Sequence, residues 1–322
     1  MIAEKETANE HTPGQNGYKQ LTRKILLHKE AVGIILAVLA TIVWSGNFIV
    51  ARGVAKHITP VSLAFFRWST ATVILAPFAM KQFLSQRKLI FKNIGYFALI
   101  SLIGVTLYNT FIYIAGHYSP AINLAIIGTT SSPVFAIILA AIILKEKITA
   151  LRIAGLCTCI IGILFLISEG SWQKLAAFQF SKGDIWILIA AVAFAIYNVL
   201  VRKKPAGISP VPFLFTTFLF GTILLVPLYI KDTHQAPPIE WNIHLVLVIL
   251  YIGAGASVTA YMLWNQAIAR LGAARTALFG NLIPVFSIIE AVIILNEKFT
   301  ITHVISSIIV IAGLVIANLR RG

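Results

Sequence analysis

Long apolar runs alternate with short polar connections along the chain from residue 31 to its end. Each run has 19 to 24 residues, close to the roughly 20 with which an α-helix crosses the hydrocarbon core of a bilayer. Strands of a membrane barrel would be much shorter and would alternate with a period of two. The sequence therefore predicts an all-α integral membrane protein with ten transmembrane helices. They are expected at residues 31–51, 61–80, 94–115, 121–144, 150–168, 183–201, 210–230, 244–267, 274–295 and 301–319.

The scarcity of charge supports the same interpretation. Of the 322 residues, 58% are hydrophobic and 11% are charged, whereas soluble domains carry about 25% charged residues. The net charge of +15 does not indicate a nucleic-acid partner, because Lys and Arg of membrane proteins collect in cytoplasmic loops. Cys157 and Cys159 stand two apart in one run, so they do not share a helical face. We expect neither a disulfide nor a metal site there.

The distribution of Lys and Arg predicts the orientation. With a cytoplasmic N-terminus, 19 of these residues lie on the cytoplasmic side of the spans and 6 on the other side. Positive residues are enriched on the cytoplasmic side, so both termini are expected in the cytoplasm and the spans in the inner (plasma) membrane. Residues 1–30 are polar and indicate a mobile cytoplasmic tail. No cleaved signal peptide is expected.

The two halves of the chain resemble each other at an offset of 150 or 151 residues. The matches are Gly33 with Gly183, Arg52 with Arg202, Pro60 with Pro210, Pro77 with Pro227, Pro133-Val134-Phe135 with Pro284-Val285-Phe286, Glu146-Lys147 with Glu297-Lys298, and Gly162 with Gly313. Each half, 31–168 and 183–319, holds five spans, so the second half enters the membrane from the opposite side. Inverted repeats of this kind build many secondary transporters. The alternative is a gene duplication in a protein that transports nothing.

Four stretches resemble a known family. They are Val43-Trp44-Ser45-Gly46-Asn47-Phe48, the segment from Pro60 through Phe66-Arg67-Trp68, the segment from Tyr113 to Glu146, and its repeat from Leu263 to Glu297. The pattern is similar to the EamA family of the drug/metabolite transporter superfamily, over nearly the whole chain beyond the tail. The resemblance implies ten helices in two inverted halves, a central cavity, and export of amino acids or other small metabolites. Glu290 departs from it, standing where an apolar residue is expected.

Arg67 and Glu290 are the only charged residues well inside predicted spans. An unpaired charge there is costly, which favours a paired or functional role. At about 1.5 Å per residue, the two lie about 10 Å and about 9 Å from the same end of the bilayer. Similar depth permits an ion pair that locks two helices. The other hypothesis is coupling or gating, with Glu290 as a protonation site.

Aromatic and amide side chains recur at spacings of three and four within the predicted helices, which puts them on shared faces. The candidate substrate-binding residues are Trp44, Asn47, Asn109, Tyr113, Asn198, Tyr261, Trp264, Asn265 and Asn281. An aromatic pocket with a few amides suits an amphipathic metabolite. Interfacial anchoring and helix packing are the alternatives. Asn281 and Glu290 are nine apart, so a straight helix points them in opposite directions.

Two prolines are candidate hinges. Pro133 and Pro284 stand in the middle of their predicted helices at equivalent positions of the repeat. A proline inside a helix removes one backbone hydrogen bond, leaving the carbonyls of Thr129 and Gly280 without their usual partners. Bends that line the pathway are one interpretation, and ordinary kinks are the other.

These features together predict a secondary transporter that exports small metabolites, amino acids or similar amphipathic solutes, by alternating access. The alternative is proton-coupled efflux of cationic drug-like compounds. The sequence has no Gly-rich phosphate loop and no pair of carboxylates within one span, so we expect no enzymatic activity, ATP hydrolysis, metal or cofactor. A lipid-modifying enzyme and a sensor are disfavoured. The expected partners are a small-molecule solute, the lipid bilayer and protons as a coupling ion, in a monomer or weak homodimer.

Overall fold

The structure is a computed structural model that describes residues 13–143, 149–176, 181–271, 276 and 279–318. All regular structure within these residues is helical, so the all-α class is confirmed. The elements are α1 (Pro13–Gly53), α2 (Pro60–Lys92), α3 (Ile94–Ser101), the π-helix η1 (Leu102–Leu107), α4 (Tyr108–Gly116), α5 (Ala121–Ile143), α6 (Ala150–Ile167), α7 (Trp172–Ala176), α8 (Lys182–Arg202), α9 (Pro210–Gln235), α10 (Ile243–Leu250), the π-helix η2 (Tyr251–Thr259), α11 (Ala260–Leu271), the 3-10 turn η3 (Gly280–Leu282), α13 (Ile283–Leu295) and α14 (Ile301–Asn318).

Seven helical segments of the described chain are long and apolar enough to cross a membrane. They are Glu30–Gly53, Pro60–Lys92, Ile94–Gly116, Ala121–Ile143, Lys182–Arg202, Pro210–Gln235 and Ile243–Leu271. Three shorter apolar helices, Ile153–Leu166, Ile283–Leu295 and Ile301–Gly313, coincide with the other three runs of the sequence. The protein is therefore a multi-pass membrane protein.

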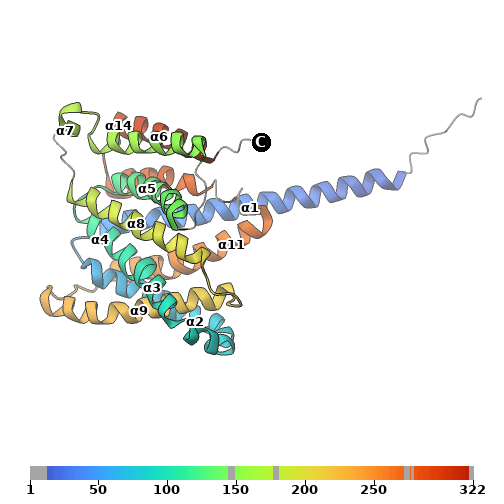
Figure 1. The fold of residues 1–322 in the computed structure, drawn as a ribbon, viewed down its shortest axis with the longest axis horizontal. Coiled ribbons are helices and arrows are strands. Elements are labelled where there is room, and N and C mark those ends of the chain that lie inside the picture. Colours follow the sequence, from blue (N-terminus) through green and yellow to red (C-terminus); the bar gives the residue numbers. More distant parts are fainter. Residues whose placement is uncertain (1–12, 144–148, 177–180, 272–275, 277–278, 319–322) are drawn as a thin grey trace, which may run out of the picture.

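The N-terminal segment differs from the expected tail. Residues 1–12 lie outside the described chain, but α1 is helical from Pro13 and runs without interruption into the first apolar run. A proline suits the first helical position because its missing N–H needs no partner there. Once the apolar segment is helical, extending the helix costs little per residue, whereas starting one is expensive. In Figure 1 α1 projects beyond the other helices.

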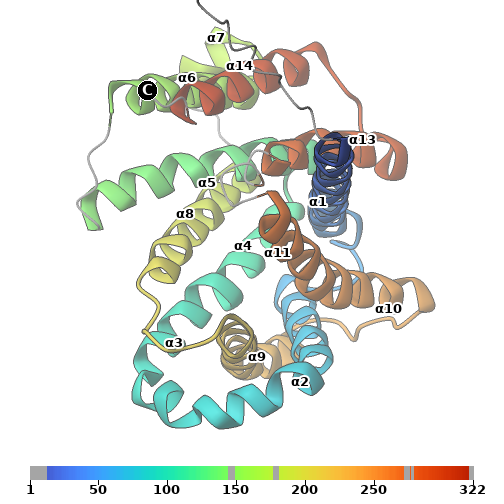
Figure 2. The same ribbon diagram turned by 90° about the vertical axis from the view of Figure 1, so that its right-hand side faces the viewer.

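Two pairs of repeat-related helices lie at opposite ends of the bundle. α6 packs on α14 and α2 packs on α9, and Figure 2 has the first pair at the top and the second at the bottom. Thr72 and Thr222, 150 positions apart, bring their hydroxyl oxygens within 3.2 Å. The Cys159 thiol lies 3.6 Å from the carbonyl oxygen of Val310, 151 positions further on. Cys157 on the same helix is exposed, as the two-residue spacing predicted.

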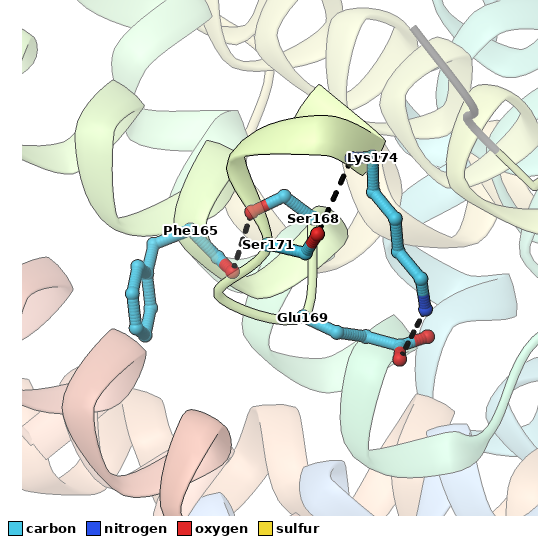
Figure 3. A network of polar contacts seen from close by, with 5 residues as sticks. All are labelled: Phe165, Ser168, Glu169, Ser171 and Lys174. Atoms are coloured by element: carbon cyan, nitrogen blue, oxygen red, sulfur yellow. Dashed lines mark hydrogen bonds and ion pairs between the residues drawn. The ribbon is translucent and has the colours of Figure 1, made fainter. Parts of the chain in front are cut away.

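The turn after α6 reverses the chain toward α7 (Figure 3). Glu169 and Gly170 adopt positive φ values of 52° and 73°, and the Gly170 amide donates to the Phe165 carbonyl at 3.0 Å. This arrangement satisfies carbonyls that the end of a helix leaves free. Lys174 Nζ lies 2.6 Å from Glu169 Oε2, in an exposed pair that contributes little stability. The hydroxyls of Ser168 and Ser171 add hydrogen bonds to the Phe165 carbonyl and from the Lys174 amide, so backbone geometry and these local bonds hold the turn (Figure 3).

Candidate substrate site

Arg67 lies at the meeting point of four helical elements. Its side chain on α2 is only 5% exposed. Nε donates to Ser257 Oγ of η2 at 2.8 Å, and Nη1 donates to the Tyr113 hydroxyl of α4 at 2.9 Å and to Asn47 Oδ1 of α1. The Tyr113 hydroxyl also donates to Asn47 Oδ1, at 3.2 Å. Two helices, α1 and α4, and the π-helix η2 thus hold the guanidinium that α2 carries.

The partners of Arg67 are all neutral. The guanidinium carbon also lies 5.0 Å from the centre of the Trp68 ring, a favourable cation–π distance. Among the residues that the structure describes, no carboxylate forms an ion pair with Arg67, and none accepts a hydrogen bond from Nη2. The buried positive charge is solvated by dipoles, and the described part of the chain supplies no counter-ion to it.

Glu290 does not pair with Arg67 in the described chain. Its Oε1 lies 2.7 Å from Ser45 Oγ, and its Oε2 is buried without a hydrogen-bond partner among the described residues. Ser45 and Asn47, the α1 contacts of the two charges, are two residues apart, which is about 200° around a helix. The two charges therefore contact different faces of α1. Similar depth in the bilayer was not sufficient for an ion pair.

An aromatic cluster stands beside the guanidinium. The Trp44 ring of α1 lies 5.3 Å from the Tyr261 ring and 5.1 Å from the Trp264 ring, both of α11. Trp44 Nε1 donates to the Ala256 carbonyl at 3.0 Å, and Ala256 is the neighbour of the Arg67 partner Ser257. Trp44 also precedes Asn47 by three residues on one face of α1. The structure thus brings the predicted aromatic and amide residues of α1, α4 and α11 together around Arg67.

A second aromatic cluster occupies the equivalent place between α4 and α8. The Phe194 ring stacks on Tyr108 at 4.6 Å and on Tyr197 at 5.9 Å. Asn198 donates to the Phe194 carbonyl of its own helix at 2.9 Å, while the buried Oδ1 of Asn109 has no hydrogen-bond partner in the described chain. Sequence reasoning missed Tyr108 and Phe194. The signal was present, since Phe194 follows Trp44 by 150 positions, the offset of the repeat.

Two other candidates are placed differently from the prediction, and a third is not described. Asn265 is exposed on α11 and contributes nothing to the cluster, although it is one residue from Trp264. The side chain of Asn281 lies outside the described part. Pro284 stands at the start of α13 rather than in mid-helix, because a residue without an N–H is tolerated in the first turn. Pro133 does lie inside α5, as predicted.

Two π-helical segments support the clusters. η1 interrupts the third apolar run and η2 the eighth, and such segments are frequent at functional sites. Gly253 of η2 packs so closely on α2 that a Cβ there would lie 2.6 Å from Thr70 Cβ. This close approach brings η2, with Ser257, within reach of Arg67. Ser257 and Ser45 were missed because a lone serine in an apolar run carries no signal.

A buried, uncompensated charge inside membrane-spanning helices characterises proteins that move ions or solutes across a bilayer. Comparison with known proteins also indicates a transporter. The EamA-like transporter family matches residues 31–168 and, a second time, residues 181–319. The chain belongs to this family, in the drug/metabolite transporter superfamily, and is a multi-pass membrane transporter.

Relatives align over most of their length. The chain is 26% identical over 288 residues to "Uncharacterized transporter YyaM" of Bacillus subtilis (strain 168), covering 89% of this chain and 94% of the relative. It is 25% identical over 291 residues to "Probable amino-acid metabolite efflux pump" of Salmonella typhimurium (strain LT2), covering 87% and 93%. A solved crystal structure with 15% identity shares the fold, with a TM-score of 0.59 over 89% of this chain and 96% of that one.

Proposed function

We propose that the protein is a secondary transporter that exports small metabolites, amino acids or similar amphipathic solutes, across the inner membrane. The observation that carries this proposal is the buried Arg67, held by neutral groups beside an aromatic cluster. Such a site offers charge, hydrogen bonds and apolar contact to an amphipathic solute. The name of the Salmonella relative, an amino-acid metabolite efflux pump, supports the solute class.

The test of this function is counterflow in proteoliposomes. Vesicles loaded with an unlabelled solute should take up the same labelled solute when the protein exchanges the two. The panel is amino acids, nucleobases and the lipophilic cation tetraphenylphosphonium. Exchange of amino acids supports the proposal. Exchange of the cation alone supports the second candidate, cationic drug efflux. This candidate is favoured by the Glu290 oxygen that has no hydrogen-bond partner among the described residues. Vesicles that exchange no solute at all would contradict both functions.

The proposed mechanism is alternating access between two inverted five-helix repeats, 31–168 and 183–319. Contacts between equivalent positions support it. A Cβ on Gly162 would lie 2.7 Å from Val310, and a Cβ on Gly313 would lie 2.7 Å from Cys159. Each contact is the image of the other at the offset of the repeat. Two halves related in this way can exchange conformations, so that a site open to one side becomes open to the other.

The inverted topology predicts that both termini and the α2–α3 junction face the cytoplasm. We expect Lys88→Cys, in a protein without Cys157 and Cys159, to resist impermeant thiol reagents added outside intact cells. Lys88 is exposed, so burial in the protein does not protect it. Lys56→Cys, exposed between α1 and α2, is the control that should react. Labelling of position 88 from outside would contradict the topology.

Pro133 is the better hinge candidate. We expect Pro133→Ala to restore an amide that donates to the Thr129 carbonyl, raising stability by up to about 3 kcal/mol. If the bend serves alternating access, turnover should fall several-fold while affinity for the solute changes little. The measurements are unfolding temperature and exchange rate. Pro284→Ala, in the first turn of α13, is the matched control with little expected effect. Unchanged turnover in the Pro133→Ala protein would show that the bend at Pro133 is an ordinary kink without a role in transport.

Glu290 is the proposed site for a coupling proton, because Ser45 contacts two oxygens with a single hydroxyl hydrogen. Ser45 Oγ lies 2.6 Å from the Ile42 carbonyl oxygen and 2.7 Å from Glu290 Oε1. A protonated Glu290 can donate to Ser45 Oγ, which then donates to Ile42. An ionised Glu290 takes the Ser45 hydrogen and leaves the Ile42 carbonyl without it. Protonation therefore changes the hydrogen bonding between α1 and α13.

A further inference from the structure

We propose that Arg67 binds a carboxylate of the transported solute, and that the neighbouring aromatic cluster takes a large apolar group of the same molecule. This inference rests on the proposed function and names its substrate class. The solute is thus an amphipathic carboxylic acid, for which an amino group is dispensable.

The charge balance of the site supports the first part of the proposal, that Arg67 binds a carboxylate. The charge of Arg67, a residue that is 5% exposed, would be expensive in a membrane without a compensating anion. The described residues supply only neutral oxygen atoms to it, from Asn47, Tyr113 and Ser257. A hydrogen bond from a guanidinium N–H to a carboxylate is charge-assisted and is stronger than one between neutral groups. Here Nε and Nη1 already donate to these three residues, whereas Nη2 donates to none of the described residues, so its hydrogens are free to bind an anion that arrives with the solute.

The three neutral partners also orient the guanidinium. Ser257 takes the Nε hydrogen, while Asn47 and Tyr113 receive hydrogens from Nη1. With the group held from two edges, little side-chain freedom is lost when an anion binds, which favours affinity. Asn47 and Tyr113 are therefore positioning residues for Arg67.

Contacts of Trp44 and Arg67 with adjacent residues support the second part of the proposal, that the aromatic cluster binds an apolar group. Trp44 and Arg67 hydrogen-bond to the consecutive η2 residues Ala256 and Ser257. The rings around Trp44 are thus adjacent to the guanidinium, and they suit an aromatic or long aliphatic side chain. Glu290 contacts Ser45 of α1, and none of the groups that hold Arg67 carries a negative charge for an ammonium group. The site therefore recognises the carboxylate and the apolar group of the solute.

Three compounds of similar size separate these contributions. They are phenylalanine, 3-phenylpropionate, which lacks the amine, and phenethylamine, which lacks the carboxylate. A ligand that binds the folded protein raises its unfolding temperature. We expect phenylalanine and 3-phenylpropionate to stabilise the purified protein in detergent, and phenethylamine to have no effect. Chloride at equal concentration is the control for a simple inorganic anion.

Two variants test the role of Arg67. Arg67→Gln should weaken carboxylate binding by about tenfold or more, the value of one charge-assisted contact. Asn47→Asp has nearly the same shape and places a permanent carboxylate on Nη1. This variant should unfold at the wild-type temperature or higher and should lose the response to both carboxylates, because its own anion neutralises Arg67. Asn93→Asp, the same change at the α2–α3 junction, is the matched control that should keep the response.

Four results would overturn the inference. They are stabilisation by phenethylamine equal to that by 3-phenylpropionate, no stabilisation by either carboxylate, the same stabilisation by chloride, or wild-type carboxylate affinity in the Asn47→Asp protein. The counterflow assay separates this failure from failure of the proposed function. If the protein exchanges a solute but binds no carboxylate, it is a transporter of another solute class, and only the inference about Arg67 fails. Carboxylate binding without exchange of any solute would contradict transport and leave the recognition site standing.

Discussion

Replacing Glu290 by Gln should give a folded protein that still exchanges solute but no longer uses a pH gradient. The amide has the shape of the carboxylic acid and can hydrogen-bond to Ser45, but it cannot gain or lose a proton. One pH unit is worth about 1.4 kcal/mol per proton, or about tenfold accumulation of a solute coupled to one proton. We expect that accumulation to vanish in proteoliposomes with an imposed gradient, while counterflow without a gradient continues.

The matched control for this variant is Glu169→Gln, which removes an equal charge from an exposed pair with Lys174. It should keep wild-type accumulation. A well-folded Glu290→Gln protein with full gradient-driven transport would contradict proton coupling at this position. Glu290 and Arg67 form no ion pair in the described chain. If the Glu290→Gln protein is less stable than the wild type, we therefore do not expect the additional change Arg67→Gln to restore its stability. Such a rescue would instead indicate a structural pair.

The substitution Gly116→Ala should abolish most of the folded protein. A Cβ at this position would lie 2.1 Å from the Ala51 carbonyl oxygen and 2.4 Å from its carbon. These are backbone atoms of the neighbouring α1, so no side-chain rotation relieves the clash and the two helices must separate. Overpacking of a core costs about 1–3 kcal/mol even when side chains can adjust, and we expect a loss at the upper end of that range or above it.

Unfolding temperature and the yield of monodisperse protein in detergent measure this effect. Gly95→Ala is the matched control, because a Cβ there would have no atom within 4 Å. It should be neutral or slightly stabilising, since alanine favours a helix more than glycine does. A Gly116→Ala protein as stable as the Gly95→Ala protein would contradict the close approach of α1 and α4.

The helices could be predicted from hydropathy, since a backbone in hydrocarbon must satisfy its hydrogen bonds within each segment. In the run at 274–295 the described residues ahead of Ile283 are helical too, but the 3-10 turn Gly280–Leu282 precedes α13 and leaves Pro284 in the first turn of that helix. Local pattern does not distinguish a proline inside a helix from one that starts it. The cost of burying charge in a membrane also predicted a paired or functional role for Arg67 and Glu290 from the sequence alone. Spacings of three and four correctly put Trp44 and Asn47 on one face of α1.

The partners of these residues depended on tertiary packing. Arg67 reaches Ser257 across 190 positions of the sequence, and Ser45 reaches Glu290 across 245. Periodicity along one helix defines its own faces, but it does not say which face of another helix lies opposite. Arg67 and Glu290 are expected at similar depth, yet they bond to different residues of α1, Asn47 and Ser45, which point about 200° apart. Depth in the bilayer follows from position along the chain, whereas rotation and neighbours follow from how the helices pack.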